Sequence, residues 1–373
     1  WRAIAASTIS VITVTVVVVV ALLADGRVGS ESSTNDGGAW LLNRGESAIG
    51  HVNRVVGEID TTTVGFSGRF DVSQSDDVVV VNDRGAGRAV LIDTALAEIG
   101  APVVIPPTAE VTATPGAIVL ADATTGSVWR VEKSLFGTVQ DLEDAPRLVQ
   151  SGSGATVAVG REGSVLVADT AVRTVSLARP GAAVQQFVVE AWGDGRSVVG
   201  ATFVGATGVI ALDDRTLLVV TDDGVEPVDT PVEFALLQQP SESAGSLGGI
   251  TSDGDAVVID LATGEEIRRE QLEGGEPVAP ILHDDCIWTV TLTPSPIFHH
   301  CGVDSPLPGA GAELKVVLVN GWVWVNDVNQ GDIWIVREDD IEVEEISDWT
   351  AALNLSDAED VTDESAGGEE DLV

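Results

Sequence analysis

The feature that most constrains the fold of this chain is a short, valine-rich unit that recurs about every 40 residues. Each unit reads as an apolar strand, a polar turn and a second apolar strand, as in Val78–Asp83 followed by Arg88–Asp93. Eight units can be aligned, and their central apolar residues lie 36 to 48 residues apart: Leu41, Val79, Ile118, Leu166, Ile210, Ile250, Ile287 and Val323. Solenoid repeats of this length are helical, whereas repeats of this length built from short strands form propeller blades. The sequence therefore predicts an all-β fold, a β-propeller over residues 39–349, with eight blades favoured and seven as the alternative.

The turns of the repeat share a pattern in which Gly follows Asp after three other residues. The pattern occurs at Asp83 and Gly87, Asp122 and Gly126, Asp260 and Gly264, and Asp327 and Gly331. An Asp side chain caps the backbone of a turn, and Gly supplies the positive φ that closes it. We interpret these residues as structural turns, with a role of the aspartates as ligands as the alternative.

Strands that flank each unit bring the number per blade to four. The last unit, 314–346, contains all four strands, whereas the first unit lacks a leading strand. We expect a C-terminal or linker strand to complete the first blade and close the ring, because closure leaves few open strand edges.

The N-terminal region predicts a membrane span. Ala3 to Ala24 is a run of 22 residues without a charge, and about 20 apolar residues in a helix cross a hydrocarbon core of ~30 Å. The run ends without the small-residue cleavage pattern of a signal peptide, so residues 1–24 are predicted as a transmembrane helix, with a cleaved signal peptide as the alternative. Residues 25–38 form a polar linker. Arg2 before the span predicts a single-pass protein of the cell membrane, with a cytoplasmic N-terminus and an extracellular propeller.

The charge of the chain excludes one class of partner. Its formal net charge is −40 and its pI is near 4.1, which argues against nucleic-acid binding, because that needs a basic surface. We interpret the acidity as a solubilising surface, with cation binding and adaptation to high salt as alternatives. Residues 350–373 are acidic and poor in large apolar side chains, as in a disordered tail or an interdomain linker.

The two cysteines, Cys286 and Cys301, lie in one unit with 14 residues between them. In an exported domain such a pair is expected to form a disulfide that closes a hairpin. The alternative is a zinc site that adds His283, His299 or His300. His299 and His300 are neighbours on a strand and point to opposite faces, so both cannot easily reach one ion. We therefore predict the disulfide and no metal.

Other candidate sites are weaker. The oxygen-rich stretches 253–255 and 326–332 could bind calcium, but neither is a twelve-residue loop ending in Glu, and turns explain both. Trp322 and Trp324 share one face of a strand, which favours a core position over a platform for carbohydrate. Motifs of nucleophilic catalysis and phosphate binding are absent from the sequence. The sequence therefore predicts neither catalytic residues nor a cofactor.

The opening of the repeat region resembles a known family. A membrane span, a short linker and then the segments 40–44, 50–53 and 57–60 (Trp-Leu-Leu-Asn-Arg, Gly-His-Val-Asn and Gly-Glu-Ile-Asp) are similar to the start of actinobacterial membrane-anchored surface proteins. Those proteins have a propeller-like region followed by fibronectin type III or immunoglobulin-like domains. No such module follows in this sequence, and the resemblance implies no catalytic residues.

These observations predict a membrane-anchored propeller that acts as a binding or scaffold module for a protein or glycan at the cell surface. The alternative is a propeller enzyme that acts on an envelope polysaccharide or a small oxidisable substrate. Acids converging with His or Arg in the central tunnel would favour the enzyme.

Overall fold

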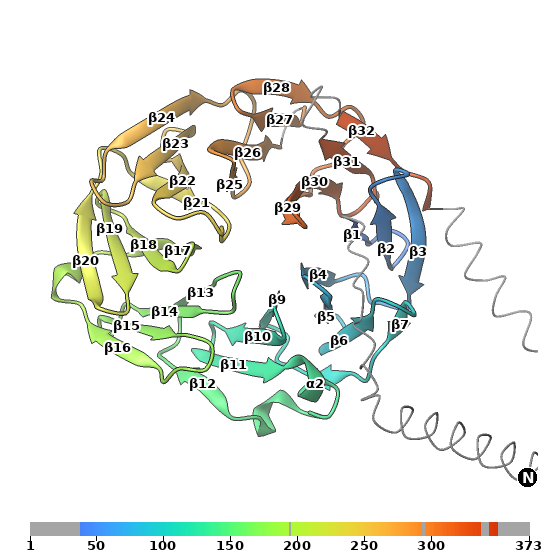
Figure 1. Ribbon diagram of the computed structural model, residues 1–373, viewed down its shortest axis with the longest axis horizontal. Helices are drawn as coiled ribbons and strands as arrows, with labels where there is room; N and C mark the ends of the chain where they lie inside the picture. The colour runs from blue at the N-terminus through green and yellow to red at the C-terminus, as the bar shows by residue number, and fades with distance from the viewer. Residues whose placement is uncertain (1–37, 194, 293–294, 337–342, 350–373) are drawn as a thin grey trace, which may run out of the picture. The chain divides into compact units, whose positions relative to one another are not determined.

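The repeating unit of the structure, a computed structural model, is a small antiparallel sheet, and eight such sheets follow one another around a central axis (Figure 1). The eight residues used to align the sequence repeat all lie in equivalent strands, from Leu41 in the first sheet to Val323 in the last. The predicted all-β propeller with eight blades is therefore confirmed. The structure describes residues 38–193, 195–292, 295–336 and 343–349.

The first four blades contain these strands. Blade 1 has β1 (Ala39–Asn43), β2 (Ala48–Asn53) and β3 (Glu58–Val64). Blade 2 has β4 (Phe70–Ser75), β5 (Val78–Asp83), β6 (Arg88–Asp93), β7 (Glu98–Ile99) and β8 (Val103–Val104). Blade 3 has β9 (Glu110–Thr114), β10 (Ala117–Asp122), β11 (Ser127–Glu132) and β12 (Arg147–Gln150), with α2 (Lys133–Phe136) and the 3₁₀ turn η1 (Leu142–Asp144) before β12. Blade 4 has β13 (Thr156–Val159), β14 (Val165–Asp169), β15 (Thr174–Ala178) and β16 (Gln185–Val188), followed by the 3₁₀ turn η2 (Glu190–Trp192).

The other four blades each have four strands. Blade 5 has β17 (Val198–Val204), β18 (Thr207–Leu212), β19 (Thr216–Thr221) and β20 (Gly224–Asp229). Blade 6 has β21 (Phe234–Leu237), β22 (Ser246–Thr251), β23 (Asp255–Asp260) and β24 (Glu266–Gln271). Blade 7 has β25 (Ile281–His283), β26 (Cys286–Thr291), β27 (Ile297–His300) and β28 (Val303–Pro306). Blade 8 has β29 (Leu314–Val319), β30 (Trp322–Asp327), β31 (Ile333–Val336) and β32 (Val343–Ile346).

The predicted membrane span (1–24), most of the linker (25–38) and the acidic tail (350–373) lie outside the described residues. Within the part of the chain that the structure does describe, none of the helices has the length and apolar character that a membrane span requires.

The apolar cores lie between neighbouring blades. One core combines Trp40 and Ile49 of blade 1 with Val79 and Val81 of blade 2. All six residues of β5 are buried, because this strand has a neighbouring sheet on each side. Burial on both faces explains why the second strands of the blades read as continuous valine-rich runs rather than as an alternation of apolar and polar residues.

Blade 1 differs from the other seven because, within the part of the chain that the structure describes, it has no innermost strand. The strand β1 is buried along its whole length, as β5 and β10 are, and in Figure 1 it is set back from the axis while β4 and β29 lie closer to it. The first unit thus has no leading strand among those of residues 38–349 that the structure describes, as predicted. A completing strand was also expected, but among the described residues the sheet of β1 contains only β1, β2 and β3.

The ring closes between blades 8 and 1 through turns and side chains instead of a shared sheet. The backbone N–H groups of Arg44 and Gly45 donate to the carbonyl oxygens of Val328 and Asn329, at 2.8 and 3.1 Å. Trp349, after β32, packs in the core that the two blades share, and its indole N–H donates to the carbonyl oxygen of Gly331 at 2.7 Å. These contacts hold the first and last blades together at the closure of the ring.

Candidate functional site

A cavity of about 200 Å³ lies at the centre of the ring, beside the position that blade 1 leaves without a strand. Its lining comes from β1, from innermost strands and the turns that follow them, and from Asn326 of β30. The polar residues of the lining are Ser73, Gln74, Ser75, Thr112, Arg161, Gln239, Lys315 and Asn326. A central hollow with a few polar groups on apolar walls is the usual location of a ligand site, so this cavity is the candidate site.

Two amide side chains occupy the hydrogen-bonding edge of β1 that faces the cavity. Gln74 of β4 accepts a hydrogen bond from the backbone N–H of Trp40 at 2.9 Å. Asn326 of β30 accepts from the backbone N–H of Leu42 and donates to its carbonyl oxygen, both at 3.0 Å. Because a buried backbone group without a partner is costly, these two amides satisfy an edge that would otherwise need a strand.

Two further side chains cross the centre of the ring to β29. Gln239, in the turn after β21, donates to the carbonyl oxygen of Val316 at 2.7 Å. Arg161, in the turn after β13, donates to that of Leu318 at 3.2 Å. Both side chains are fixed by backbone carbonyls from blades far away in the sequence, so the cavity walls are preorganised.

A group of charged residues surrounds Asp71 next to the cavity. The Asp71 carboxylate lies 3.2 Å from Arg44 and 4.0 Å from Arg84, and it also contacts Lys315. Arg44 pairs in addition with Glu313. Three cations and two carboxylates therefore meet where blades 8, 1 and 2 approach each other.

The charged residues of the lining itself are Arg161 and Lys315, and the described lining contains neither an acid nor a histidine. Neither Arg161 nor Lys315 was singled out from the sequence. They converge only in three dimensions, since Arg161 and Leu318 are 157 positions apart. One signal was available: Asn precedes Asp at the end of both β5 and β30, and Asn82, like Asn326, reaches the backbone of the next blade.

The predicted turn residues Asp83, Asp122 and Asp327 share a second function, in addition to capping their own turns. Each ends the second strand of its blade, is almost fully buried, and accepts hydrogen bonds from the loop that enters the same blade. The donors are Ser67 for Asp83, Thr108 for Asp122 and the backbone N–H of Gly311 for Asp327. These aspartates join two loops at one face of the propeller, and Gly87, Gly126 and Gly331 follow them with positive φ.

Asp260 and Gly264 have the same spacing but a different place in the blade. They connect the third and fourth strands of blade 6, so their turn lies at the opposite face of the propeller from the other three. The Asp260 carboxylate accepts only from its own turn, from the backbone N–H groups of Ala262 and Thr263. The sequence pattern therefore identifies a turn but not which hairpin of the blade the turn closes, because Asx–Gly turns occur wherever a hairpin closes.

Hydrogen bonds lower the pKa values of two aspartates that end second strands, Asp169 and Asp122. Burial by itself raises the pKa of Asp169, which ends β14, but hydrogen bonds from Gly152, Ser151, Val172 and Ala171 together outweigh it and lower the pKa. The pKa of Asp122 is lowered in the same way: desolvation by burial raises it, but the hydrogen bonds from Thr125, Thr108 and Thr124 outweigh this effect. Both carboxylates are thus held in the charged form.

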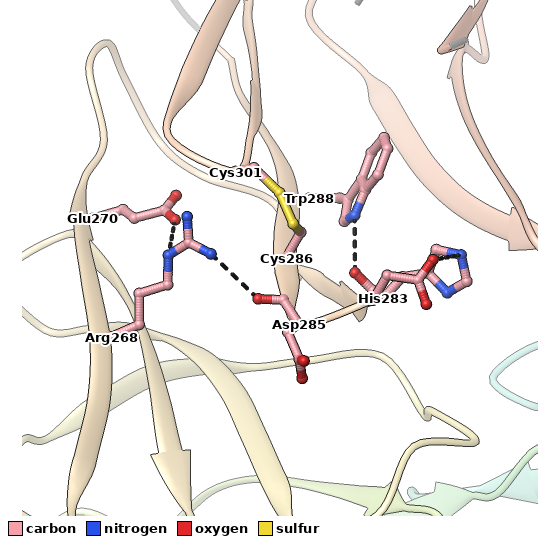
Figure 2. The surroundings of a disulfide bond; sticks show 8 residues. Arg268, Glu270, His283, Asp285, Cys286, Trp288 and Cys301 are labelled. Carbon is pink, nitrogen blue, oxygen red and sulfur yellow. Dashed lines mark hydrogen bonds and ion pairs between the residues drawn. A yellow bond between two sulfur atoms is a disulfide. The ribbon is translucent and has the colours of Figure 1, made fainter. Parts of the chain in front are cut away.

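The predicted disulfide between Cys286 and Cys301 is present, with a Cα–Cα distance of 4.9 Å. Figure 2 shows it beside Trp288, with Arg268 of β24 reaching toward it between the Glu270 carboxylate and the carbonyl oxygen of Asp285. It connects the start of β26 to the residue after β27. The bond therefore closes the open end of one hairpin in blade 7.

The disulfide leaves no cysteine thiolate for the zinc site that was the alternative. His300 lies with the two cysteines in a group whose potential ligand atoms are within 4.8 Å of one another, but both sulfurs are bonded to each other. Burial lowers the pKa of His300, and the nearby Arg268 adds to the effect. His283 lies instead 3.5 Å from Asp284. The absence of a bound metal stays a prediction.

His299 points to the other face of β27, as the strand geometry predicted. Its Nε2 lies 3.0 Å from Thr291 Oγ1, and its Nδ1 lies 2.6 Å from Asp304. This arrangement resembles a nucleophile, base and acid, but the Thr291 hydroxyl is buried and lies 2.8 Å from the carbonyl oxygen of Glu273, to which it donates. Thr291 ends the second strand of blade 7 and is bonded to the blade-entry loop, as the aspartates are, although Thr291 donates where the aspartates accept. The network is therefore structural.

The other sequence candidates are occupied by protein contacts. The Asp327 oxygens accept from the backbone N–H groups of Gly311, Asn329 and Gln330, and Asp255 pairs with Arg269 at 2.8 Å. Hydrogen-bond donors therefore face the carboxylates of Asp327 and Asp255, one in each stretch proposed for calcium.

The tryptophan pair has a core role. Trp324 is fully buried, and Trp322 packs against the same cluster. The guanidinium group of Arg54 lies over the Trp322 ring. The ring face is therefore covered by a protein side chain in this structure.

Comparisons with known proteins agree on the architecture. No protein-family model matches the chain, and no curated protein matches it significantly. The structure of apo AztD from Citrobacter koseri is similar with a TM-score of 0.56 and 13% sequence identity, over 83% of this chain and 94% of that chain. The computationally designed Ika8 protein is similar with a TM-score of 0.54 and 17% identity, over 74% of this chain and 85% of that one. At such identities the likeness shows the fold alone, so the class of the chain is β-propeller.

Proposed function

We propose that this chain is a membrane-anchored protein of the cell surface whose propeller is a binding module, with the central cavity as its ligand site. The observation that carries the proposal is the cavity beside β1, whose sheet has no innermost strand among the described residues. Its polar side chains are held in place by backbone groups, as Gln239 and Arg161 show. A rigid hollow of this kind binds a ligand without a large loss of conformational entropy.

Two observations support the location. The run from Ala3 to Ala24 has the length and composition of a membrane span, and the disulfide fits an oxidising compartment. The resemblance to actinobacterial surface proteins supports the same location. The enzyme alternative required acids that converge in the tunnel, and nothing in the described lining favours it.

Binding is tested by filling the cavity. The full chain is screened by thermal shift against a panel of monosaccharides, amino acids and small organic acids. Thr112, which lines the cavity from β9, is replaced in Thr112→Trp, and the exposed Val64 on the outer strand β3 is replaced in the control Val64→Trp. We expect ligands of the wild-type chain to lose their effect in Thr112→Trp only. Equal responses in both variants would place binding elsewhere.

Location is tested on intact cells that make the full chain. Proteinase K added outside should digest the propeller, and the protein should stay with membranes after a carbonate wash. A variant without residues 3–24 should leave the membrane fraction. Protection from the protease, together with free thiols at Cys286 and Cys301, would contradict the proposal.

A further inference from the structure

We propose that the cavity binds a small anionic molecule, in particular one with a carboxylate group. This inference rests on the proposed binding function and adds the chemical class of the ligand. Four properties of the cavity support it: the sign of its charged residues, their incomplete neutralisation, their arrangement along one strand and the size of the cavity.

The sign of the charge in the lining is opposite to that of the chain. The sequence has 59 acidic and 19 basic residues, so a random pair of charged residues would contain at least one acid in most cases. The charged residues in the described lining are nevertheless Arg161 and Lys315. Because the two charged residues of the lining are both cations, the cavity favours an anionic ligand even though the protein as a whole is strongly acidic.

Neither cation is neutralised by its protein partner. Lys315 contacts Asp71, but Asp71 is shared with Arg44 and Arg84, and the group that includes Glu313 keeps an excess of one positive charge. Arg161 pairs with Glu242 at 3.3 Å, but the Glu242 side chain is 79% exposed. Exposed ion pairs of this kind contribute little and are easily exchanged for another partner.

The two cations are arranged along one strand. Lys315 belongs to β29, and Arg161 is anchored on Leu318 of the same strand. Three residues of a strand span about 10 Å, so a small molecule can place its carboxylate on one cation and its hydroxyl groups on the amides of Gln74 and Gln239. Arginine offers a fork of donors and lysine a compact charge, and both suit a carboxylate.

The volume limits the size of the ligand. A cavity of about 200 Å³ is smaller than the roughly 300–1,000 Å³ typical of pockets for drug-sized ligands. A single acidic sugar or a short dicarboxylic acid is therefore a suitable probe, and a polymer is not.

The chain offers a direct experiment, because it has only two lysines, Lys133 and Lys315. Both contact an aspartate, and their side chains are 38% and 35% exposed, so Lys133 is a matched control. The full chain is labelled by reductive methylation, and each lysine is quantified by peptide mass spectrometry. The probes are D-glucuronate against D-glucose and succinate against succinamide, at constant ionic strength because salt screens charge.

We expect at least one acid to protect Lys315 and not Lys133, and its neutral counterpart to protect neither. Calorimetric affinity for that acid should fall at least tenfold in Lys315→Gln and stay unchanged in Lys133→Gln. Equal binding of acid and neutral probe, with loss in Thr112→Trp, would overturn the inference and leave the binding function intact. If no probe of either pair protects Lys315, the inference is wrong, and a blank thermal-shift panel would then reject the cavity as a ligand site as well.

Discussion

At the scale of single residues, the same side chain has different roles according to its place in the blade. Asp327 and Asp260 are each followed by Gly after three residues. Asp327 is fully buried and joins its turn to the entry loop through Gly311, whereas Asp260 serves only its own turn. A local pattern predicts the turn, but burial depends on which loop of the blade lies above it.

Replacing these two aspartates separates the two roles. We expect Asp327→Ala to lower the free energy of unfolding by roughly 3 kcal/mol, because it removes hydrogen bonds to a buried charge from two loops. Asp260→Ala should have a much smaller effect. Urea unfolding of both variants measures the difference, and equal losses would show that the link to the entry loop contributes nothing.

The lowered pKa values of Asp122 and Asp169 predict a dependence of stability on acid. A folded-state pKa below the unfolded value of about 3.9 means that the unfolded chain binds protons first as the pH falls. The contribution of these residues is therefore fully present above about pH 4 and is lost as the pH falls through their folded-state values. Ser151→Ala, which removes one bond to Asp169, should raise the pKa of Asp169. Carbon-13 carboxyl titration tests this shift, and an unchanged Asp169 titration would contradict it.

At the scale of the strand and the blade, the sequence predicts much of the fold and little of the site. The second strands are buried on both faces, so units such as Val78–Asp83 stand out as apolar runs and reveal the period. The innermost strands face the channel with one edge and carry a weaker pattern, as the half-buried residues of β13 show. Lys315 and Gln74 lie on such strands, and what they contact is determined by the closure of the ring.

The open edge of β1 gives a prediction at this scale. Asn326→Ala should leave the N–H and C=O groups of Leu42 without partners and lower the free energy of unfolding by roughly 2–4 kcal/mol. Amide exchange at Leu42 should accelerate as well. Asn329→Ala, at an exposed position of the next turn, is the control and should change neither quantity. Unchanged exchange at Leu42 would mean that the Asn326 amide does not replace a strand.

The disulfide of blade 7 belongs to the same scale, because it constrains one hairpin. Its two cysteines are 15 residues apart, and closing a loop of that size stabilises a fold by about 3 kcal/mol in the chain-entropy model. The variant with both Cys286→Ser and Cys301→Ser should lose about that amount in urea unfolding. A reducing agent should destabilise the wild-type chain and leave the double variant unchanged, and a loss in both would point to an effect unrelated to the bond.

At the scale of the whole molecule, blade 1, which has no innermost strand among the described residues, is where the two ends of the propeller meet. Blade 8 has its own four strands, so closure depends on Trp349, on the turn contacts of Arg44 and on the amide of Asn326. The cavity lies beside β1, and Asn326, which helps to close the ring, lines it. Arg44 lies close to it as well, because its partner Asp71 also contacts the lining residue Lys315. The seam of the ring, the junction of blades 8 and 1, therefore adjoins the candidate ligand site.

The net charge acts on the whole molecule as well. A formal charge of −40 on 373 residues opposes the compact state through self-repulsion, which falls when the chain unfolds and the charges separate. Since the Debye length falls from about 30 Å at 0.01 M salt to about 8 Å at 0.15 M, the melting temperature should rise by several degrees over this range of sodium chloride. Potassium chloride should give the same rise, because screening depends on ionic strength and not on the cation. A melting temperature that does not change with salt would contradict this prediction and would mean that weakened ion pairs offset the relief of repulsion. A much larger rise with one of the two cations would indicate that this cation binds at a specific site.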